Sequence, residues 1–323
     1  MTRQATCIAL AVACFAAAQS WQTQTGGTTV SLRSVMAVSA QVVWASGTKG
    51  TFLRTTDGGT TWRASVVRGA ADLDFRTVYG FDDSTAVLLS TGSGPASRIY
   101  RTVDAGGTWS LAYTNGDPAG SFDAVGFWDE AHGILIGDPV KGRFTVMTTA
   151  DGGVSWHKEK GPVASEKETA ADGPCLFTRG TREAWFASSG EARVFHTTDG
   201  GQTWNATKTL PLKSASSLAF ASGLRGVLVG GGVAVSEDGG KTWTAALASS
   251  PAGPRSAVAY NAAQKLYVAV GPSGSDVSAD GGKSWKPIGN TAFDALSFGM
   301  DGSGWAVGPN GAVAKFSDKP NAQ

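Results

Sequence analysis

One eight-residue turn pattern recurs along most of the chain and constrains its fold more than any other feature. The pattern reads Ser/Thr-x-Asp-x-Gly-x-Ser/Thr-Trp and first appears at 55–62. Its aspartates are Asp57, Asp104, Asp151, Asp199, Asp238 and Asp280, and its tryptophans are Trp62, Trp109, Trp156, Trp204, Trp243 and Trp285. Successive aspartates are 47, 47, 48, 39 and 42 residues apart. A period of this length indicates a repeat architecture.

A second series of short apolar segments, each ending in glycine, runs in step with these turns. Its seven copies lie at 43–47, 87–92, 134–137, 185–190, 227–230, 266–271 and 305–308. Another apolar stretch precedes each copy, so every unit supplies an inner strand, a Gly-ended strand, a strand entering the turn and a strand starting at Trp. Four short strands per unit are typical of a propeller blade. The sequence therefore predicts an all-β, seven-bladed β-propeller with four-stranded blades.

The seventh unit has no Trp turn of its own and ends at 315–318. Trp21 precedes the first full unit and can supply the seventh tryptophan. We therefore expect a strand near Trp21 to form the outer strand of blade seven and close the ring, which removes an open sheet edge. The expected domain organisation is one propeller over residues 19–323.

The first 18 residues have the pattern of a secretory signal peptide. Arg3 precedes an apolar run at 7–15, and the small residues 16–18 follow as a cleavage site. The alternative is a lipoprotein acylated at Cys14. The run is too short for a permanent membrane anchor, so we expect no transmembrane segment. The interpretation is an exported protein, periplasmic or secreted.

Charge and motif content exclude several classes of function. The formal charge of +1 falls to zero when residues 1–18 are removed, so we expect no nucleic-acid partner. No Gly-x-Gly-x-x-Gly segment follows a strand and opens a helix. His132, His157 and His196 show no metal-ligand spacing. We therefore expect no cofactor, no metal and no catalytic residue.

The residue types of the repeated turn suit structural tasks. Aspartate can accept hydrogen bonds from turn N–H groups, and glycine permits positive φ. The Ser/Thr hydroxyl can brace the hairpin, while Trp buries a large area between blades. Six carboxylates spread around a rim cannot converge on one site. We therefore interpret these aspartates and tryptophans as structural.

These turns resemble the Asp boxes, or BNR repeats, of sialidases, sortilin-type propellers and several glycoside hydrolases. The fuller unit, with Gly-Trp-Ala-Val-Gly at 304–308 and the turn at 54–62, is similar to the photosystem II stability/assembly-factor family. The similarity spans essentially the whole chain after residue 18. It implies a seven-bladed propeller that acts as a non-catalytic binding or assembly scaffold.

The same resemblance implies an arginine patch drawn partly from the position before each turn. That position holds Arg54 and Arg101 in the first two turns. The other four turns carry Thr148, His196, Val235 and Val277 there. The patch is therefore reduced in this chain.

The irregular loops indicate where a site could lie. Connections between second and third strands share a face with the links between blades, opposite the Asp turns. They are elaborated at 90–98, 137–143 and 188–193, and the link 157–173 is the longest. Functional residues concentrate on such loops. We select Asp138, Arg143, Glu168 and Arg193 as candidate ligand- or partner-binding residues.

Three interpretations of this cluster remain open. The first is a docking surface for a protein or peptide partner, and we expect this one. The second is a carbohydrate-active hydrolase in which Asp138 and Glu168 face each other about 5–10 Å apart across an open pocket. The third is a solvated group of loops that binds no ligand.

Overall fold

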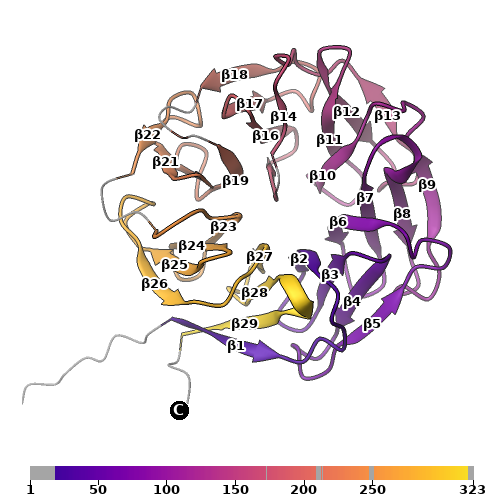
Figure 1. The fold of residues 1–323 in the computed structure, drawn as a ribbon, viewed down its shortest axis with the longest axis horizontal. Coiled ribbons are helices and arrows are strands. Elements are labelled where there is room, and N and C mark those ends of the chain that lie inside the picture. The colour runs from indigo at the N-terminus through magenta and orange to yellow at the C-terminus, as the bar shows by residue number, and fades with distance from the viewer. Residues whose placement is uncertain (1–18, 172, 209–211, 213, 247–250, 319–323) are drawn as a thin grey trace, which may run out of the picture.

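The computed structural model describes residues 19–318 except 172, 209–211, 213 and 247–250. The proposed signal segment 1–18 lies outside the described residues. Seven antiparallel sheets surround a central axis, which confirms the seven-bladed propeller (Figure 1). In the part of the chain that the structure describes, no helix is long and apolar enough to cross a membrane.

The first three blades each contain four strands. Blade 1 contains β2 (Leu32–Ala37), β3 (Val43–Gly47), β4 (Thr51–Thr55) and β5 (Arg63–Val66). Blade 2 contains β6 (Asp74–Gly80), β7 (Ala86–Thr91), β8 (Arg98–Thr102) and β9 (Ser110–Thr114), with the 3-10 turn η1 at Gly94–Ala96. Blade 3 contains β10 (Phe122–Phe127), β11 (Gly133–Val140), β12 (Arg143–Thr149) and β13 (His157–Glu159).

Blade 4 departs from the predicted four strands. It contains β14 (Thr169–Ala170), β15 (Leu176–Arg179), β16 (Glu183–Ser189), β17 (Arg193–Thr197) and β18 (Asn205–Lys208). Both β14 and β15 pair with β16, at opposite ends of that strand. The inner strand of this blade is therefore interrupted, and the chain leaves the sheet between Ala171 and Cys175, which both still bond to Ala187 of β16.

The last three blades return to four strands. Blade 5 contains β19 (Ala215–Phe220), β20 (Gly226–Gly230), β21 (Val233–Ser236) and β22 (Thr244–Ala245). Blade 6 contains β23 (Ala257–Asn261), β24 (Leu266–Gly271), β25 (Gly274–Ser278) and β26 (Lys286–Gly289). Blade 7 contains β27 (Ala295–Phe298), β28 (Gly304–Val307), β29 (Val313–Ser317) and β1 (Ser20–Gln24), with the 3-10 turn η2 at Pro309–Gly311.

The N-terminal strand closes the ring as predicted. Strand β1 pairs antiparallel with β29, and Trp21 stands opposite Phe316. The Trp21 side chain is buried, and its ring lies 5.3 Å from that of Phe316 and 5.4 Å from that of Phe293. The first and last strands of the propeller therefore complete one sheet.

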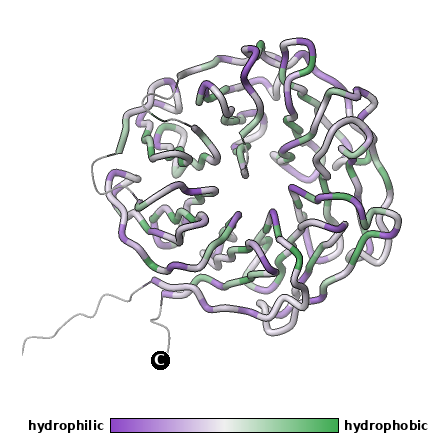
Figure 2. Tube along the Cα trace, viewed as in Figure 1, coloured by the Kyte–Doolittle hydropathy of each residue, from purple (hydrophilic) through white to green (hydrophobic). Residues whose placement is uncertain are grey.

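The core lies between neighbouring blades. Every residue of β3 and β24 is buried, because the second strand of a blade is covered on both faces by the adjacent blades. Trp44, Trp185 and Trp305 are fully buried at equivalent places in such strands. Figure 2 shows this distribution, with hydrophobic segments running through the blades.

The first Asp turn shows how the repeated motif folds. Asp57 Oδ1 accepts hydrogen bonds from Thr55 Oγ1 at 2.8 Å and Thr61 N at 2.9 Å, and Oδ2 accepts one from Thr61 Oγ1 at 2.6 Å. Gly59 has φ of 86° and donates its N–H to Thr55 Oγ1. Hydrogen bonds from Thr61 hold the pKa of Asp57 at about 2. The carboxylate thus ties the two ends of its own hairpin together.

Candidate functional site

The four candidate residues of the loop face all contact, or belong to, one link between blades 3 and 4. Arg143 Nη1 donates a hydrogen bond to Gly161 O at 2.9 Å. Asp138 Oδ1 accepts one from Ala170 N at 3.0 Å. Arg193 Nη2 donates to Val163 O at 3.1 Å. The structure therefore gathers these side chains around residues 160–171, which we call the braced link.

A buried ion pair forms the centre of the braced link. The Glu168 side chain is fully buried, and Arg193 binds it through Nε, at 2.8 Å from Oε1, and through Nη2. Ser188 Oγ also donates to Glu168 Oε1, and Ser165 N donates to Oε2 at 3.1 Å. Burial raises the pKa of Glu168, but the hydrogen bonds from Arg193 and Ser188 outweigh it and lower the pKa overall.

The burial of Glu168 argues against the interpretation of this cluster as a hydrolase site. Both carboxylate oxygens of Glu168 accept two hydrogen bonds each, and the residue is only 3% exposed. A glycosidase needs two carboxyl groups facing an open cavity that admits the sugar. Glu168 instead holds the link against blade 4, so it lacks the access to substrate that this chemistry requires.

A second polar feature, which the sequence reasoning missed, surrounds the central axis on the same face. The inner strands of blades 1, 2, 3 and 5 each have a register shift near their first residue. The residues displaced from the pairing are Arg33, Arg76, Asp123 and Ser216. A bulge of this kind re-aims a side chain away from the regular ladder. Ser256 and Asp294 directly precede the inner strands of blades 6 and 7.

These positions border a cavity at the mouth of the central channel. The cavity has a volume of about 250 Å³ and is lined by Arg33, Arg76, Gly173, Ser256 and Asp294, which come from five different blades. Figure 2 shows hydrophilic residues at the inner ends of several blades. We call this feature the axial mouth.

Gly173 closes one side of the axial mouth because blade 4 leaves its sheet there. A Cβ atom at Gly173 would lie 2.7 Å from Ser256 O and 3.1 Å from Ser216 O. Only glycine allows the backbone to approach blades 5 and 6 this closely. The interruption between β14 and β15 therefore narrows the channel on the side opposite the charged residues.

The charged side of the axial mouth contains loosely paired groups. Arg33 Nε lies 3.3 Å from Asp74 Oδ2, and Arg33 Nη1 lies 3.6 Å from Asp294 Oδ2. Burial raises the pKa of Asp294, and Arg33 offsets only part of this effect. Both signs of charge are therefore present at one small cavity.

Two larger grooves lie on the Asp-turn face, each between two neighbouring blades. One, of about 410 Å³, is lined by Tyr260 and Lys283 among others, and the other, of about 390 Å³, by Trp128 and His157. The axial mouth draws its lining from more blades than either groove. Within the described ranges, no group of three or more His, Cys, Asp or Glu is arranged to hold a metal.

Comparison with known proteins gives the family context. Residues 117–254 match the family described as photosynthesis system II assembly factor YCF48. The solved structure "YCF48 bound to D1 peptide" superposes with a TM-score of 0.72 at 16% identity, covering 96% of this chain and all of that one. YCF48 from Cyanidioschyzon merolae gives 0.71 at 18% identity, covering 92% and 98%. The chain therefore shares the propeller fold of the YCF48 structures, and its residues 117–254 are similar to that family.

Other comparisons extend only to the fold. The GH74 xyloglucanase from Xanthomonas campestris superposes with a TM-score of 0.66 at 15% identity, covering 92% of this chain and 53% of the enzyme. No curated protein matches the sequence significantly. Shared propeller architecture does not carry an activity with it.

The resemblance to the YCF48 family implies an arginine at the position before each Asp turn. In this structure, cations at that position lie over buried tryptophan rings. Arg54 lies over the Trp44 ring at 5.3 Å, and Lys315 lies over the Trp305 ring at 5.0 Å. Lys315 Nζ also donates to Gly58 O of the next blade at 3.0 Å. Lys315 is a third cation at this position, and it was overlooked because blade 7 lacks an Asp turn.

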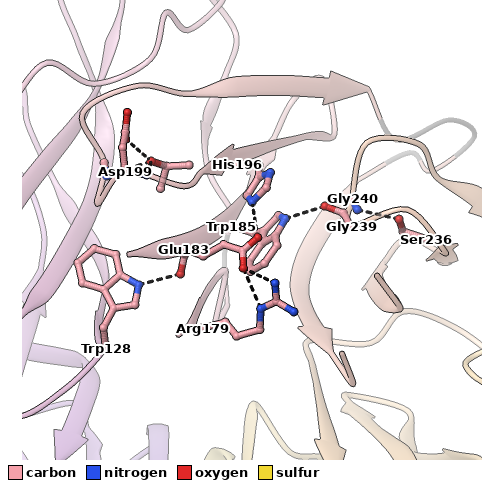
Figure 3. A network of polar contacts seen from close by, with 11 residues as sticks. Trp128, Arg179, Glu183, Trp185, His196, Asp199, Ser236, Gly239 and Gly240 are labelled. Atoms are coloured by element: carbon pink, nitrogen blue, oxygen red, sulfur yellow. Dashed lines mark hydrogen bonds and ion pairs between the residues drawn. The ribbon is translucent and has the colours of Figure 1, made fainter. Parts of the chain in front are cut away.

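His196 occupies the same position in blade 4 (Figure 3). Its ring stacks on Trp185 at 4.4 Å, and its Nε2 lies 3.0 Å from Glu183 Oε1. Burial lowers the pKa of His196, with Glu183 opposing the shift. Trp185 Nε1 donates to Gly239 O of blade 5 at 3.0 Å, and Trp128 Nε1 of blade 3 donates to Glu183 O at 2.7 Å. His196 therefore contacts only Trp185 and Glu183 of its own blade in these interactions, while Trp185 and Trp128 make the hydrogen bonds between blades.

Proposed function

We propose that the chain is an exported, non-catalytic scaffold that docks a protein or peptide segment on its loop face. The observation that carries this proposal is the braced link, because its buried ion pair fixes an irregular loop in place. The YCF48 family match supports a scaffold role. The solved YCF48 structure described as bound to D1 peptide supports a peptide as the partner.

The surface beside the braced link has the mixed character of docking sites. Val163 is 58% exposed although its carbonyl is held by Arg193. Arg143 is exposed beside it. A shallow depression of about 540 Å³, lined by Tyr113, Lys141 and neighbouring residues, lies between the adjoining loops of blades 2 and 3. An apolar anchor with a charged rim suits a peptide partner.

Binding of displayed peptides to the purified full chain tests the docking proposal, with the D1 peptide as one defined probe. We expect the selected peptides to compete with one another for the chain. Arg143→Glu should weaken their binding by at least tenfold, which is about 1.4 kcal/mol. Arg182→Glu, an exposed arginine on the Asp-turn face, is the matched control and should leave binding unchanged. Equal loss in both variants, or turnover of a xyloglucan oligosaccharide, would contradict the proposal.

Export is part of the same proposal and rests on the pattern of residues 1–18. Mass spectrometry of the protein recovered from its native host should find an N-terminus near residue 19 in the periplasmic or secreted fraction. Recovery of the chain with residues 1–18 intact in the cytoplasm would contradict export. An acyl group on Cys14 would support the lipoprotein alternative instead.

A further inference from the structure

The axial mouth offers space for a small ligand. Its volume of about 250 Å³ corresponds to about eight water molecules at roughly 30 Å³ each. Arg33, Arg76 and Asp294 line one side, while Gly173 and Ser256 line the other. A small organic ion fits this volume, whereas an oligosaccharide exceeds it.

Some buried polar atoms beside the axial mouth make no hydrogen bond within the described part of the chain. Arg33 Nε and Asp74 Oδ1 are buried and lack a hydrogen-bond partner among the described residues. The ion pairs of Arg33, at 3.3 and 3.6 Å, are longer than the roughly 2.7–2.9 Å of a well-formed charge-assisted hydrogen bond. Buried polar groups in this condition indicate a bound water, ion or ligand.

The charges at the axial mouth favour a ligand that carries both signs. The guanidinium groups of Arg33 and Arg76 can bind a carboxylate through paired N–H donors. Asp294 lines the cavity beside these two cations, whereas Asp74 and Asp123 pair with Arg33 and Arg76 next to it. Arg33 Nη1 lies 3.6 Å from Asp294 Oδ2, and it only partly offsets the burial that raises the pKa of Asp294. An ammonium group beside Asp294 would provide a closer positive charge.

We propose that the axial mouth binds a free α-amino acid with a small side chain, whose carboxylate pairs with Arg33 and whose ammonium pairs with Asp294. The ligand replaces the long contact between these two side chains with two short charge-assisted hydrogen bonds. Gly173 and Ser256 face the ligand's side chain and limit its size. This site lies beyond the proposed docking of a peptide and functions without it.

Calorimetric titration of the full chain with glycine, L-alanine and L-serine tests this assignment. Propionate and ethylamine serve as probes that each keep one charged group of L-alanine. We expect at least one amino acid to bind, and either single-charge probe to bind at least tenfold more weakly. Arg33→Gln and Asp294→Asn should each weaken amino-acid binding by at least tenfold, while Arg182→Gln on the opposite face should leave it unchanged.

Ser256→Leu gives a test that leaves the charges intact. The larger side chain should narrow the cavity and weaken amino-acid binding by at least tenfold, while thermal unfolding shows that the propeller remains folded. Three results would overturn the proposal. These are no binding of any of the three amino acids, propionate binding as tightly as L-alanine, and unchanged amino-acid affinity in Arg33→Gln or Ser256→Leu.

Discussion

At the scale of single residues, positive-φ glycines differ in what surrounds them. Gly59 sits in the first Asp turn with φ of 86°, and Gly69 lies in the following link with φ of 74°. A Cβ at Gly59 would approach within 2.7 Å of Trp305 Cζ3 and closer still to Cη2, whereas a Cβ at Gly69 meets nothing within 4 Å. The two positions share a backbone conformation but differ in packing.

Alanine at these two glycines separates backbone strain from overpacking. Both substitutions force an L-residue into the left-handed region, at a cost of about 1–2 kcal/mol. Gly59→Ala must also displace the buried Trp305 ring, which adds about 1–3 kcal/mol. Urea denaturation should therefore show Gly59→Ala to be the less stable variant by that added amount. Equal stabilities would mean that the Trp305 ring moves without cost.

At the scale of the element, each Asp turn ties a hairpin through its carboxylate. In the third turn burial raises the pKa of Asp151, but hydrogen bonds from Ser155 outweigh it and bring the pKa to about 2. In the sixth turn burial likewise opposes hydrogen bonds from Ser284, and the pKa of Asp280 is also about 2. The ordinary value is 3.8, so these turns are sensitive to acid as a group.

Acid should destabilise the propeller through these turns. Between pH of about 4 and 2 the unfolded chain binds protons that the folded turns exclude, so the stabilisation present above pH 4 is lost as the pH falls. We expect the midpoint of thermal unfolding to decline steeply over this window. Asp151→Asn should flatten the decline, because it removes one titrating group. A midpoint that is flat from pH 4 to 2 would contradict this role of the carboxylates.

Among the strands and turns, the features that repeat along the chain could be predicted from the sequence. The Asp turns and glycine-ended strands repeat, so their periodicity alone indicated the blades and the closure by Trp21. The axial mouth escaped notice because Arg33, Arg76 and Asp123 lie at register shifts, and alternation along a strand does not reveal such shifts. Alignment of the units shows one signal, a charged residue before a small one at Arg33-Ser34, Asp123-Ala124 and Asp294-Ala295.

Blade 4 and the loops around Glu168 show a second limit of prediction from sequence. The link 157–173 read as one long loop, yet it contains β13 and β14 at its two ends. The four candidate residues were correctly expected near one another, but sequence could not show that Glu168 and Arg193 neutralise each other in the interior. Pairing between residues 25 positions apart depends on the path of the intervening backbone.

At the scale of the whole molecule, closure depends on a five-residue strand. Trp21 packs on Phe293 and Phe316, and β1 completes the hydrogen bonding of β29. Without β1 the edge of β29 would be open to pairing with another chain. The stability of the ring and its resistance to aggregation therefore rest on the same segment.

Two variants distinguish these contributions. Trp21→Ala removes a buried aromatic side chain and should lower the free energy of unfolding by about 3–5 kcal/mol while the protein stays monodisperse. Deletion of residues 19–24 should also expose the edge of β29 and produce larger species in light scattering. A monodisperse deletion variant as stable as the full chain would contradict closure by β1.

The pairing of β1 with β29 also sets an order of events during synthesis. Ser20 pairs with Ser317, so strand β1 has a partner that is synthesised 297 residues later. Contacts of such long sequence separation form late and slow folding. The blades between them can assemble while the chain grows, but the ring stays open until its final strand is released, and β1 must remain unpaired until then.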